Sequence, residues 1–539
     1  MSSTEDLFRR LEQLNEIGVA LSRQRDIAHL LEKILVAAKD ITRADGGTLY
    51  RVVEEGRALR FEIIRTDSLG IAMGGSTGKA IAFPDIPLRG EDGSPNERNV
   101  VAYSVNRDTT VLIDDAYTER GFDFSGTRRF DEGTGYRSRS FLTVPMKNHE
   151  GEIIGVLQLI NALDADGAVG SFSDADRRLA ESLASQAAIA LTNRQLIAQL
   201  EELFESFITL INLAIDEKSP YTGGHCQRVP ELTMMIAEAA DAVAEGPLAA
   251  FSMSERDRYE LKIAGMLHDC GKVTTPVHVV DKATKLQTLF DRMHLVDTRY
   301  EVLKRDVEIE SLRRQLAIAR GEVLAEDAGI PHECHEEIRR LDEERDFLRR
   351  CNIGGEAMSP EDQQRVRDIG SLRRWRNVDG VISDFLSADE IENLTIRAGT
   401  LTAGERDTIN YHIVATIKML EQLPWPRHLL NVPEYAGGHH ERMDGKGYPR
   451  GLTREQMSLQ ARMMGIADIF EALTARDRPY KKGMKLSQAL SILGNFCRTG
   501  HIDPDLFEVF VREKVYLRYA QRFLDEAQID AVDERAVLN

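Results

Sequence analysis

The spacing of apolar residues divides the chain into a mixed first third and an almost wholly helical remainder. Residues 5–43 repeat apolar positions every three or four residues, which predicts a helix. After Gly46-Gly47 short apolar runs rich in β-branched and aromatic residues predict strands. We place them at residues 48–53, 59–64, 99–104, 110–113, 141–147 and 153–160, with a hairpin turn before the last. The first third is therefore predicted to be an α+β domain.

A long helical run begins at Ser173 and continues for about forty residues without glycine or proline. Along one face of this helix, mainly apolar residues follow one another at alternating steps of four and three, as in the seam of a coiled coil, with polar residues in the middle. The seam is Leu179, Leu183, Gln186, Ala190, Asn193, Ile197, Leu200, Phe204, Phe207, Ile211 and Ala214. Such a helix is either a core helix of one domain or a connector between two copies of the chain. We favour a connector over residues 173–215, and therefore a homodimer.

From residue 216 onward the pattern predicts helices alone, and one part of it is unusually charged. Residues 285–398 combine dense charges of alternating sign with sparse apolar positions such as Leu303, Leu316 and Leu341. This pattern predicts a solvated, antiparallel helical hairpin.

Composition indicates a soluble protein of several domains, because 539 residues are too many for one hydrophobic core. No apolar stretch reaches the roughly 18 residues of a membrane span, and the N-terminus lacks the apolar core of a signal peptide. We therefore expect a cytoplasmic location and no membrane partner.

The formal net charge of −19 should repel nucleic-acid polymers, so an anionic substrate must be attracted locally, by metals and a few cations. Five cysteines without a CxxC pair argue against a disulfide framework and a structural zinc knuckle.

Histidines stand in adjacent pairs with each other or with aspartate inside mainly apolar segments, as His268-Asp269 and His439-His440. Such pairs are costly to bury without a purpose. Neutral imidazoles with a carboxylate suit iron, manganese or zinc, and an aspartate can bridge two metals. Two close metals can stabilise both oxygens of an in-line displacement at phosphorus, so a phosphodiester is a suitable substrate. By contrast, His332-Glu333-Cys334-His335 lies on the charged segment and is interpreted as solvated helix.

Five separated segments carry a specific pattern of histidine, aspartate and glycine. They are Tyr221-Thr222-Gly223-Gly224-His225, His268-Asp269 with Gly271-Lys272, His412, His439-His440-Glu441 with Asp444-Gly445-Lys446-Gly447-Tyr448-Pro449, and Asp468. This pattern resembles the HD-GYP domain, a subgroup of the HD superfamily of metal-dependent phosphohydrolases. The resemblance covers about residues 210–280 and 400–520. It implies an all-α helical bundle over residues 210–539 that hydrolyses cyclic di-GMP to pGpG, to GMP, or to both.

The resemblance implies a centre of two divalent metals, with iron or manganese the implied ions. One metal would be held by His225, His268, Asp269 and Asp468, and the other by Asp269, His412, His439 and His440. Some family members carry a glutamate four residues before the first histidine, which adds a third metal. Tyr221 stands at that position, so we expect no third metal.

The same resemblance implies the groups that act on the substrate. Lys272 and Asp269 would be the catalytic groups, with Lys272 in contact with a phosphate or the attacking water. Gly445 and Gly447 can take positive φ and let their loop approach the substrate. The other substrate contacts would be Tyr448, Arg478 and Lys481. Glu441 is either a general base or a group that orients a histidine.

The segments Ala44-Asp45-Gly46-Gly47-Thr48, Val144-Pro145-Met146, Gly155-Val156-Leu157-Gln158-Leu159-Ile160-Asn161 and Phe172-Ser173-Asp174-Ala175-Asp176 resemble a GAF domain, a small-molecule sensor and dimerisation module. The resemblance implies a sensor domain over residues 1–195 with an unidentified small ligand. The predicted fold class is thus multidomain: an α+β GAF domain, a long connector helix, and an all-α HD-type bundle with an inserted helical hairpin.

Three functions remain open at this point. The first is a GAF-regulated cyclic di-GMP phosphodiesterase, and the second is a phosphodiesterase for another cyclic dinucleotide. The third is a non-catalytic scaffold that binds cyclic di-GMP and reports it to partners. The insertion at residues 285–398 separates His268 from His412, so both its ends lie near predicted ligands. It could cover the cleft, form a dimer contact, or recruit a protein partner.

Overall fold

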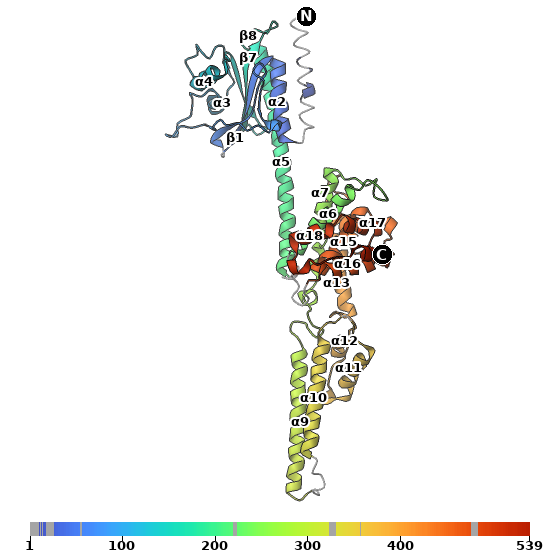
Figure 1. Ribbon diagram of the computed structural model, residues 1–539. Helices are drawn as coiled ribbons and strands as arrows, with labels where there is room; N and C mark the ends of the chain where they lie inside the picture. The colour runs from blue at the N-terminus through green and yellow to red at the C-terminus, as the bar shows by residue number, and fades with distance from the viewer. Residues whose placement is uncertain are drawn as a thin grey trace. The chain divides into compact units, whose positions relative to one another are not determined.

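The computed structural model describes residues 10, 12, 15–17, 26–53, 56–218, 224–322, 330–355, 357–475 and 483–538. The chain forms two compact units, Met1–Phe204 and Glu205–Asn539. The first is a sheet with helices on it, and the second is almost wholly helical (Figure 1).

The first unit is built on one antiparallel sheet with the strand order β3-β2-β1-β7-β6-β5, and β4 and β8 are short additions to it. The strands are β1 Ala44–Val53, β2 Ala58–Thr66, β3 Ile71–Gly74, β4 Ile86–Pro87, β5 Val111–Ile113, β6 Phe141–Lys147, β7 Ile153–Leu163 and β8 Val169–Gly170. The helices are α2 Ile27–Thr42, the short 3-10 turn η2 Gly75–Thr77, α3 Val100–Arg107, α4 Ser125–Thr134 and α5 Asp174–Lys218. The predicted hairpin of β6 and β7 and the α+β class are confirmed.

Apolar cores lie on both faces of this sheet. Helices α2 and α5 cover one face, and α3 with the chain up to Phe124 covers the other (Figure 1). Gly47 in β1 permits the close approach of α2, because a Cβ there would lie 2.8 Å from Leu35 Cδ1. The glycines at the start of β1 are therefore packing residues.

Two predicted elements of the first unit are wrong. Residues 99–104 do not form a strand, because Asn99 accepts hydrogen bonds from the backbone N–H groups of Val101 and Ala102 and starts helix α3. The β-branched and aromatic residues that suggested a strand instead pack this helix against the sheet. The helix predicted over residues 5–43 is also interrupted, since Asp26 has an extended backbone and caps α2.

Helix α5 has two halves with different surroundings. Residues such as Leu179, Leu183 and Leu191 belong to the core of the first unit. Further along, apolar side chains are exposed: Leu196, Ile197, Leu200, Leu203, Phe207, Leu210, Ile211 and Leu213. The predicted seam therefore starts as a core helix and becomes an exposed apolar stripe only in its second half.

The helical unit has a bundle whose segments lie on either side of an insertion. Before the insertion come α6 His225–Asp241, α7 Glu255–Leu267, η3 Cys270–Thr274 and α8 Val277–Val280. After it come α13 Ala403–Leu420, α14 Val432–Gly437, η4 Arg454–Gln456, α15 Leu459–Thr474, α16 Leu486–Arg498, α17 Pro504–Arg512, α18 Val515–Phe523, η5 Glu526–Gln528 and α19 Glu534–Leu538. Helix α6 packs against α7, α15, α17 and α18, which places it inside the bundle.

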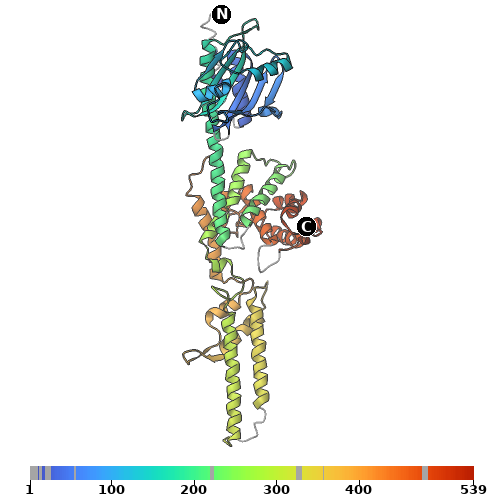
Figure 2. The same cartoon turned by 90° about the vertical axis from the view of Figure 1, so that its left-hand side faces the viewer.

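The insertion is a small module with a core of its own, and not only a solvated hairpin. Helices α9 Met293–Ala319 and α10 Ile330–Asn352 run side by side in antiparallel directions (Figure 2). Around their base fold α11 Pro360–Leu372, the two strands β9 Arg374–Arg376 and β10 Ile382–Asp384, and α12 Ala388–Leu394. Tyr300, Leu348 and Phe385 are fully or almost fully buried among these elements. The sequence pattern did not predict this core, because the apolar residues that form it are widely spaced among charged ones.

Polar tethers fix both ends of the insertion to the bundle. Lys282 Nζ donates to Asn393 Oδ1 at 2.7 Å and to both carboxylate oxygens of Glu405 at 2.7 and 2.8 Å. Thr400 Oγ1 donates to the carbonyl of Lys282 at 2.8 Å. The chain therefore leaves and re-enters the bundle at one place. Within the described residues, none of the helices combines the length and hydropathy that a membrane span requires.

Candidate metal centre

Tight helix packing brings the first three predicted ligands together. His225 begins α6, while His268 and Asp269 follow α7. Gly265 lets α7 lie against α6, because a Cβ there would be 3.1 Å from Pro230 Cα. The nitrogens and oxygens of His225, His268 and Asp269 lie within 4.8 Å of one another, and all three residues are buried.

The other ligands come from the far side of the insertion. His412 lies on α13, His439 and His440 follow α14, and Asp468 lies on α15. Gly271 allows α13 to reach the centre, because a Cβ at Gly271 would lie 2.0 Å from the carbonyl oxygen of His412. The ring nitrogens of His412, His439 and His440 form a second group within 4.8 Å.

Asp269 lies between the two groups, with one carboxylate oxygen toward each. Its Oδ2 is 3.2 Å from His225 Nε2 and 3.3 Å from His268 Nε2. Its Oδ1 is 3.3 Å from His412 Nε2. Asp468 Oδ1 joins the first group at 3.3 Å from His225 Nε2. The structure thus brings together all seven predicted ligands, in the two sets that the sequence suggests.

Backbone carbonyls orient three of the imidazoles. The Nδ1 atoms of His268, His412 and His439 lie 2.6 to 2.7 Å from the carbonyl oxygen three residues earlier in each case. An Nδ1–H that donates there leaves the Nε2 lone pair facing the centre, which is the usual arrangement of a metal-binding histidine. Among the described residues, His439 Nε2 and Asp269 Oδ1 have no hydrogen-bond partner although both are buried. A cation would satisfy both atoms, so this donor set fits metal ions.

The pKa shifts of His439 and His440 also suit metal binding. Burial lowers the pKa of His440 to about 4 and that of His439 well below its ordinary value. Both rings are therefore neutral at physiological pH and keep a lone pair available. Burial opposes the charge on Lys272, but Asp269 and Asp468 raise its pKa, so its ammonium stays protonated.

Glu471 is a functional candidate that the sequence reasoning missed. Its Oε2 lies 2.5 Å from His225 Nδ1, and its Oε1 accepts from Arg228 at 2.7 and 2.8 Å. Burial works against ionisation of Glu471, but His225 and Arg228 lower its pKa to about 2. A carboxylate behind a metal-binding histidine fixes the ring and raises its basicity. The available signal was spacing: Glu471 follows Asp468 by one helical turn on α15 and therefore lies on the same face.

The groups predicted to contact substrate have other partners in this structure. Lys272 Nζ lies 2.5 Å from Asp269 Oδ2, so its charge is directed at the shared aspartate. The ring of Tyr448 stacks on the imidazole of His440, with centroids 4.8 Å apart. Tyr448 therefore supports a predicted metal ligand, and burial raises its pKa to about 12.

The loop after His440 is closed by hydrogen bonds to Glu441. Both its carboxylate oxygens accept backbone N–H groups, from Arg450 at 2.7 Å and Leu452 at 2.9 Å. Glu441 is thus a loop clamp, and no hydrogen bond joins it to a histidine among the described residues. Gly445 has the expected positive φ of 73°, whereas Gly447 does not. Gly447 instead lets its backbone lie against that of Arg442, because a Cβ at Gly447 would be 2.4 Å from the backbone nitrogen of Arg442.

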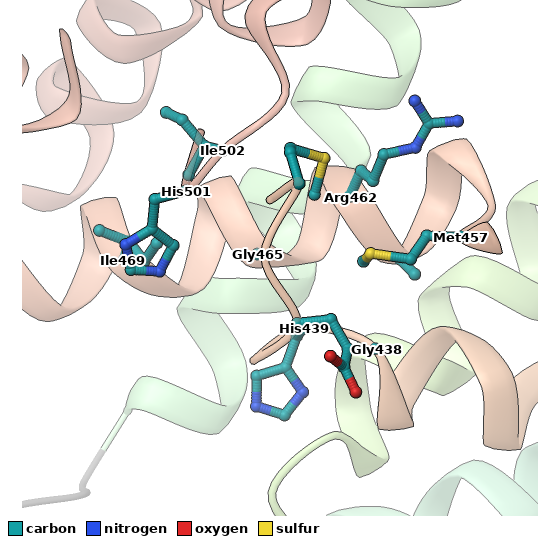
Figure 3. A pocket seen from close by; sticks show the side chains of 11 residues that line it. Gly438, His439, Met457, Arg462, Gly465, Ile469, His501 and Ile502 are labelled. Atoms are coloured by element: carbon teal, nitrogen blue, oxygen red, sulfur yellow. The ribbon is translucent and has the colours of Figure 1, made fainter. Parts of the chain in front are cut away.

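A small cavity of about 10 Å³ lies behind His439, lined by residues that include Glu441, Arg462 and His501. Figure 3 shows the imidazole of His439 turned away from Arg462. Helix α15 passes close behind, because Gly465 has no side chain and its Cβ position is 3.1 Å from the carbonyl oxygen of His439. Helix α15 therefore packs directly against the backbone of His439.

Three predicted site residues, Tyr221, Arg478 and Lys481, lie outside the described residues. His332 and His335 are exposed on α10, as the interpretation of their segment as solvated helix expects.

Family models match both parts of the chain. A model described as GAF domain matches residues 26–191. Two models described as HD domain match residues 222–344 and 387–506. The chain therefore carries a GAF domain followed by an HD region, which confirms these two resemblances.

Several characterised proteins resemble parts of this chain. A 3′3′-cGAMP-specific phosphodiesterase from Vibrio cholerae is 46% identical over 153 residues, which cover 28% of this chain and 35% of that protein. A cyclic di-GMP phosphodiesterase from Pseudomonas aeruginosa is 49% identical over 74 residues, covering 14% and 17%. One from Thermotoga maritima is 31% identical over 137 residues, covering 25% and 36%. The chain thus spans little more than a third of these relatives at most.

Proposed function

We propose that this protein is a GAF-regulated, metal-dependent phosphodiesterase that hydrolyses cyclic di-GMP. The observation that carries the proposal is Asp269, whose two oxygens face separate histidine groups. A buried carboxylate in this place costs free energy unless cations lie on both sides of it.

We propose that two divalent metals, iron or manganese, occupy this centre, without a third. His225, His268, Asp269 and Asp468 would hold one ion, and Asp269, His412, His439 and His440 the other. Bound metals would supply Lewis acidity and an activated water at neutral pH. Nitrogen and carboxylate donors without a cysteine suit these ions.

The chain's own cations would bind and orient the phosphodiester. The protonated Nζ of Lys272 lies at the shared aspartate, where it can donate to a phosphoryl oxygen and stabilise charge that develops there. Arg478 and Lys481 would add positive charge, and the loop with Gly445, Gly447 and Tyr448 would form one wall of the substrate site. Such local cations would offset the repulsion expected from a net charge of −19.

The products would be pGpG, GMP or both. A second candidate substrate is 3′3′-cGAMP, favoured by the resemblance to the Vibrio cholerae enzyme. Both are cyclic dinucleotides with the same backbone, so the same metal chemistry serves either. Side-by-side turnover of the two substrates distinguishes them.

We further propose a homodimer that pairs through the second half of α5. Leu196, Leu203 and Leu210 repeat at seven-residue intervals and are exposed, as in an unpaired coiled-coil helix. The GAF domain would bind a small ligand and control the enzyme through this helix. Mass measurement of Leu203→Asp/Leu210→Asp against the unmodified chain tests the dimer, which should become monomeric.

The insertion would recruit a protein partner. Apolar side chains are exposed on and beside its β-hairpin: Leu372, Val378, Val381 and Ile382. Replacing Val378 and Ile382 by serine should abolish capture of that partner while hydrolysis stays unchanged.

The decisive test is metal analysis and product identification on anaerobically purified protein. Two equivalents of iron or manganese and conversion of cyclic di-GMP to a linear product are expected. Stoichiometric binding of cyclic di-GMP that persists for hours with metals present would instead establish the scaffold function. If the protein leaves cyclic di-GMP intact but hydrolyses 3′3′-cGAMP rapidly, the substrate is 3′3′-cGAMP, and the proposed metal chemistry is unchanged.

A further inference from the structure

The last turns of α5 belong to the helical unit, and they have two unlike sides. Residues 205–218 lie within that unit. Ile208, Asn212 and Ile215 follow at steps of four and three and are buried, while Phe207 and Leu210 are exposed. One side of the connector end is therefore packed into the bundle, and the other is open.

The buried side carries an amide that holds the backbone just before the His268-Asp269 pair. Asn212 is only 6% exposed, and its Nδ2 donates to the carbonyl oxygen of Met266 at 2.9 Å. Met266 lies in the last turn of α7, two residues before His268. An amide buried in an apolar surrounding keeps its place only if it finds such a partner.

The end of α5 holds the backbone just after the same pair. Lys218 Nζ donates to the carbonyl oxygen of Val273, and it lies 3.5 Å from the carbonyl oxygen of Lys272. The side chain of Lys272 in turn contacts Asp269. Lys218 therefore fixes the short η3 turn from which the predicted catalytic ammonium projects.

We propose that Asn212 and Lys218 are positioning residues of the metal centre, and that the connector helix sets the place of Asp269 and Lys272 by holding the backbone on both sides of them. This inference rests on the proposed phosphodiester hydrolysis. Among the described residues, neither side chain forms a hydrogen bond to a predicted ligand side chain, so both act through carbonyl groups. Because both donors project from α5, a rotation or shift of that helix would move both away from their acceptors. A displacement of about 1 Å at the reacting groups is enough to cost a large part of the rate.

The test uses the full chain with Lys218→Met, which keeps most of the aliphatic stem and removes the donor. We expect kcat to fall about tenfold, KM to change less than about twofold, and metal content to stay at the wild-type value. Amide hydrogen exchange of residues 271–275 should accelerate, while that of α13 and α15 stays unchanged. Lys218→Arg restores a donor at this position and should recover most of kcat. Asn212→Leu should behave like Lys218→Met, with faster exchange at residues 264–268.

The matched control is Lys262→Met, which breaks the partly exposed Lys262–Glu205 ion pair between the same two helices, α7 and α5. It should leave kcat within about twofold, because ion pairs that solvent screens contribute little. A lowered Tm with unchanged kcat in Lys218→Met would show a merely structural role and overturn the proposal, as would failure of the arginine to recover activity. If the wild-type protein hydrolyses no cyclic dinucleotide, the proposed function fails. The exchange experiment then still decides whether Lys218 holds the turn, and unchanged exchange overturns the inference.

Discussion

The metal centre and the inserted module both bury charged side chains, but they satisfy them differently. In the insertion, Arg299 donates to both carboxylate oxygens of Glu390 at 2.8 and 3.0 Å. Glu390 also accepts the N–H of Ser387 and caps α12. In the centre, Asp269 Oδ1 and His439 Nε2 lack a hydrogen-bond partner among the described residues. Buried charges that pair with each other define a structure, whereas buried polar atoms that converge without hydrogen-bond partners indicate a ligand.

The same comparison separates the candidate centre from a short sequence that only resembles a metal motif. His332, Cys334 and His335 have ligand chemistry and close spacing, but two of them are exposed and no candidate ligand group within the described residues includes them. His268 and His412 stand far apart in sequence, yet both take part in the centre. Convergence of separate elements, and not proximity in sequence, therefore distinguishes the site.

The largest expected effect is that of Asp269→Asn, which keeps the shape and removes the shared charge. Hydrolysis of the cyclic dinucleotide should fall at least about 10³-fold, because neither metal would keep its bridging ligand. Metal analysis should give at most one equivalent. His332→Ala is the control and should retain full metal content; two metals and normal activity in Asp269→Asn would refute the assignment.

A smaller effect is expected for Glu471→Gln, which keeps the size of the side chain behind His225. Affinity for one metal should weaken about 10- to 100-fold, because the histidine loses its orienting carboxylate. Titration of metal into the metal-free protein should show one weakened and one unchanged site. Equal weakening of both, or of neither, would count against the role of Glu471.

In the insertion, Glu390→Gln should change stability and leave the metals untouched. We expect a loss of about 1–3 kcal/mol in unfolding free energy, because the partly buried Arg299 would lose its charge partner. Chemical denaturation and hydrogen exchange in α12 measure this. The control is Glu343→Gln, whose exposed pair with Arg339 is expected to contribute at most about 0.5 kcal/mol. If Glu390→Gln changed the metal content, the contrast drawn between the two regions would be wrong.

The smallest effect concerns pH. Burial opposes the charge on Glu390, but Arg299 and the cap at Ser387 lower its pKa below the ordinary 4.5. A lowered pKa contributes stability that is present above pH 4.5 and is lost as the pH falls through the folded-state value. The stability difference between the wild type and Glu390→Gln should therefore shrink in acid. A constant difference between pH 6 and pH 3 would contradict this.

Part of the site could be predicted from the residues themselves, because His268-Asp269 and His439-His440 are adjacent pairs with glycines close by. His225, His412 and Asp468 stand alone, and only the family pattern selected them. Glu471 escaped because a glutamate on a helix is ordinary until its position relative to His225 is known. The part that Glu441 plays in closing its loop could not be predicted, because its partners are backbone N–H groups, which the residue types do not reveal.

The sequence by itself determined the helical and strand periodicities, the order of the domains and the place of the insertion, since these depend on residue types and local spacing. The donor set came from the resemblance to a known family. It could not determine which side of each helix faces inward, because that depends on contacts between distant segments. Only the tertiary structure decided that half of the predicted seam is a core helix and that residues 99–104 form a capped helix. It also placed the two oxygens of Asp269 toward separate histidine groups, and the end of the connector against the backbone that carries them.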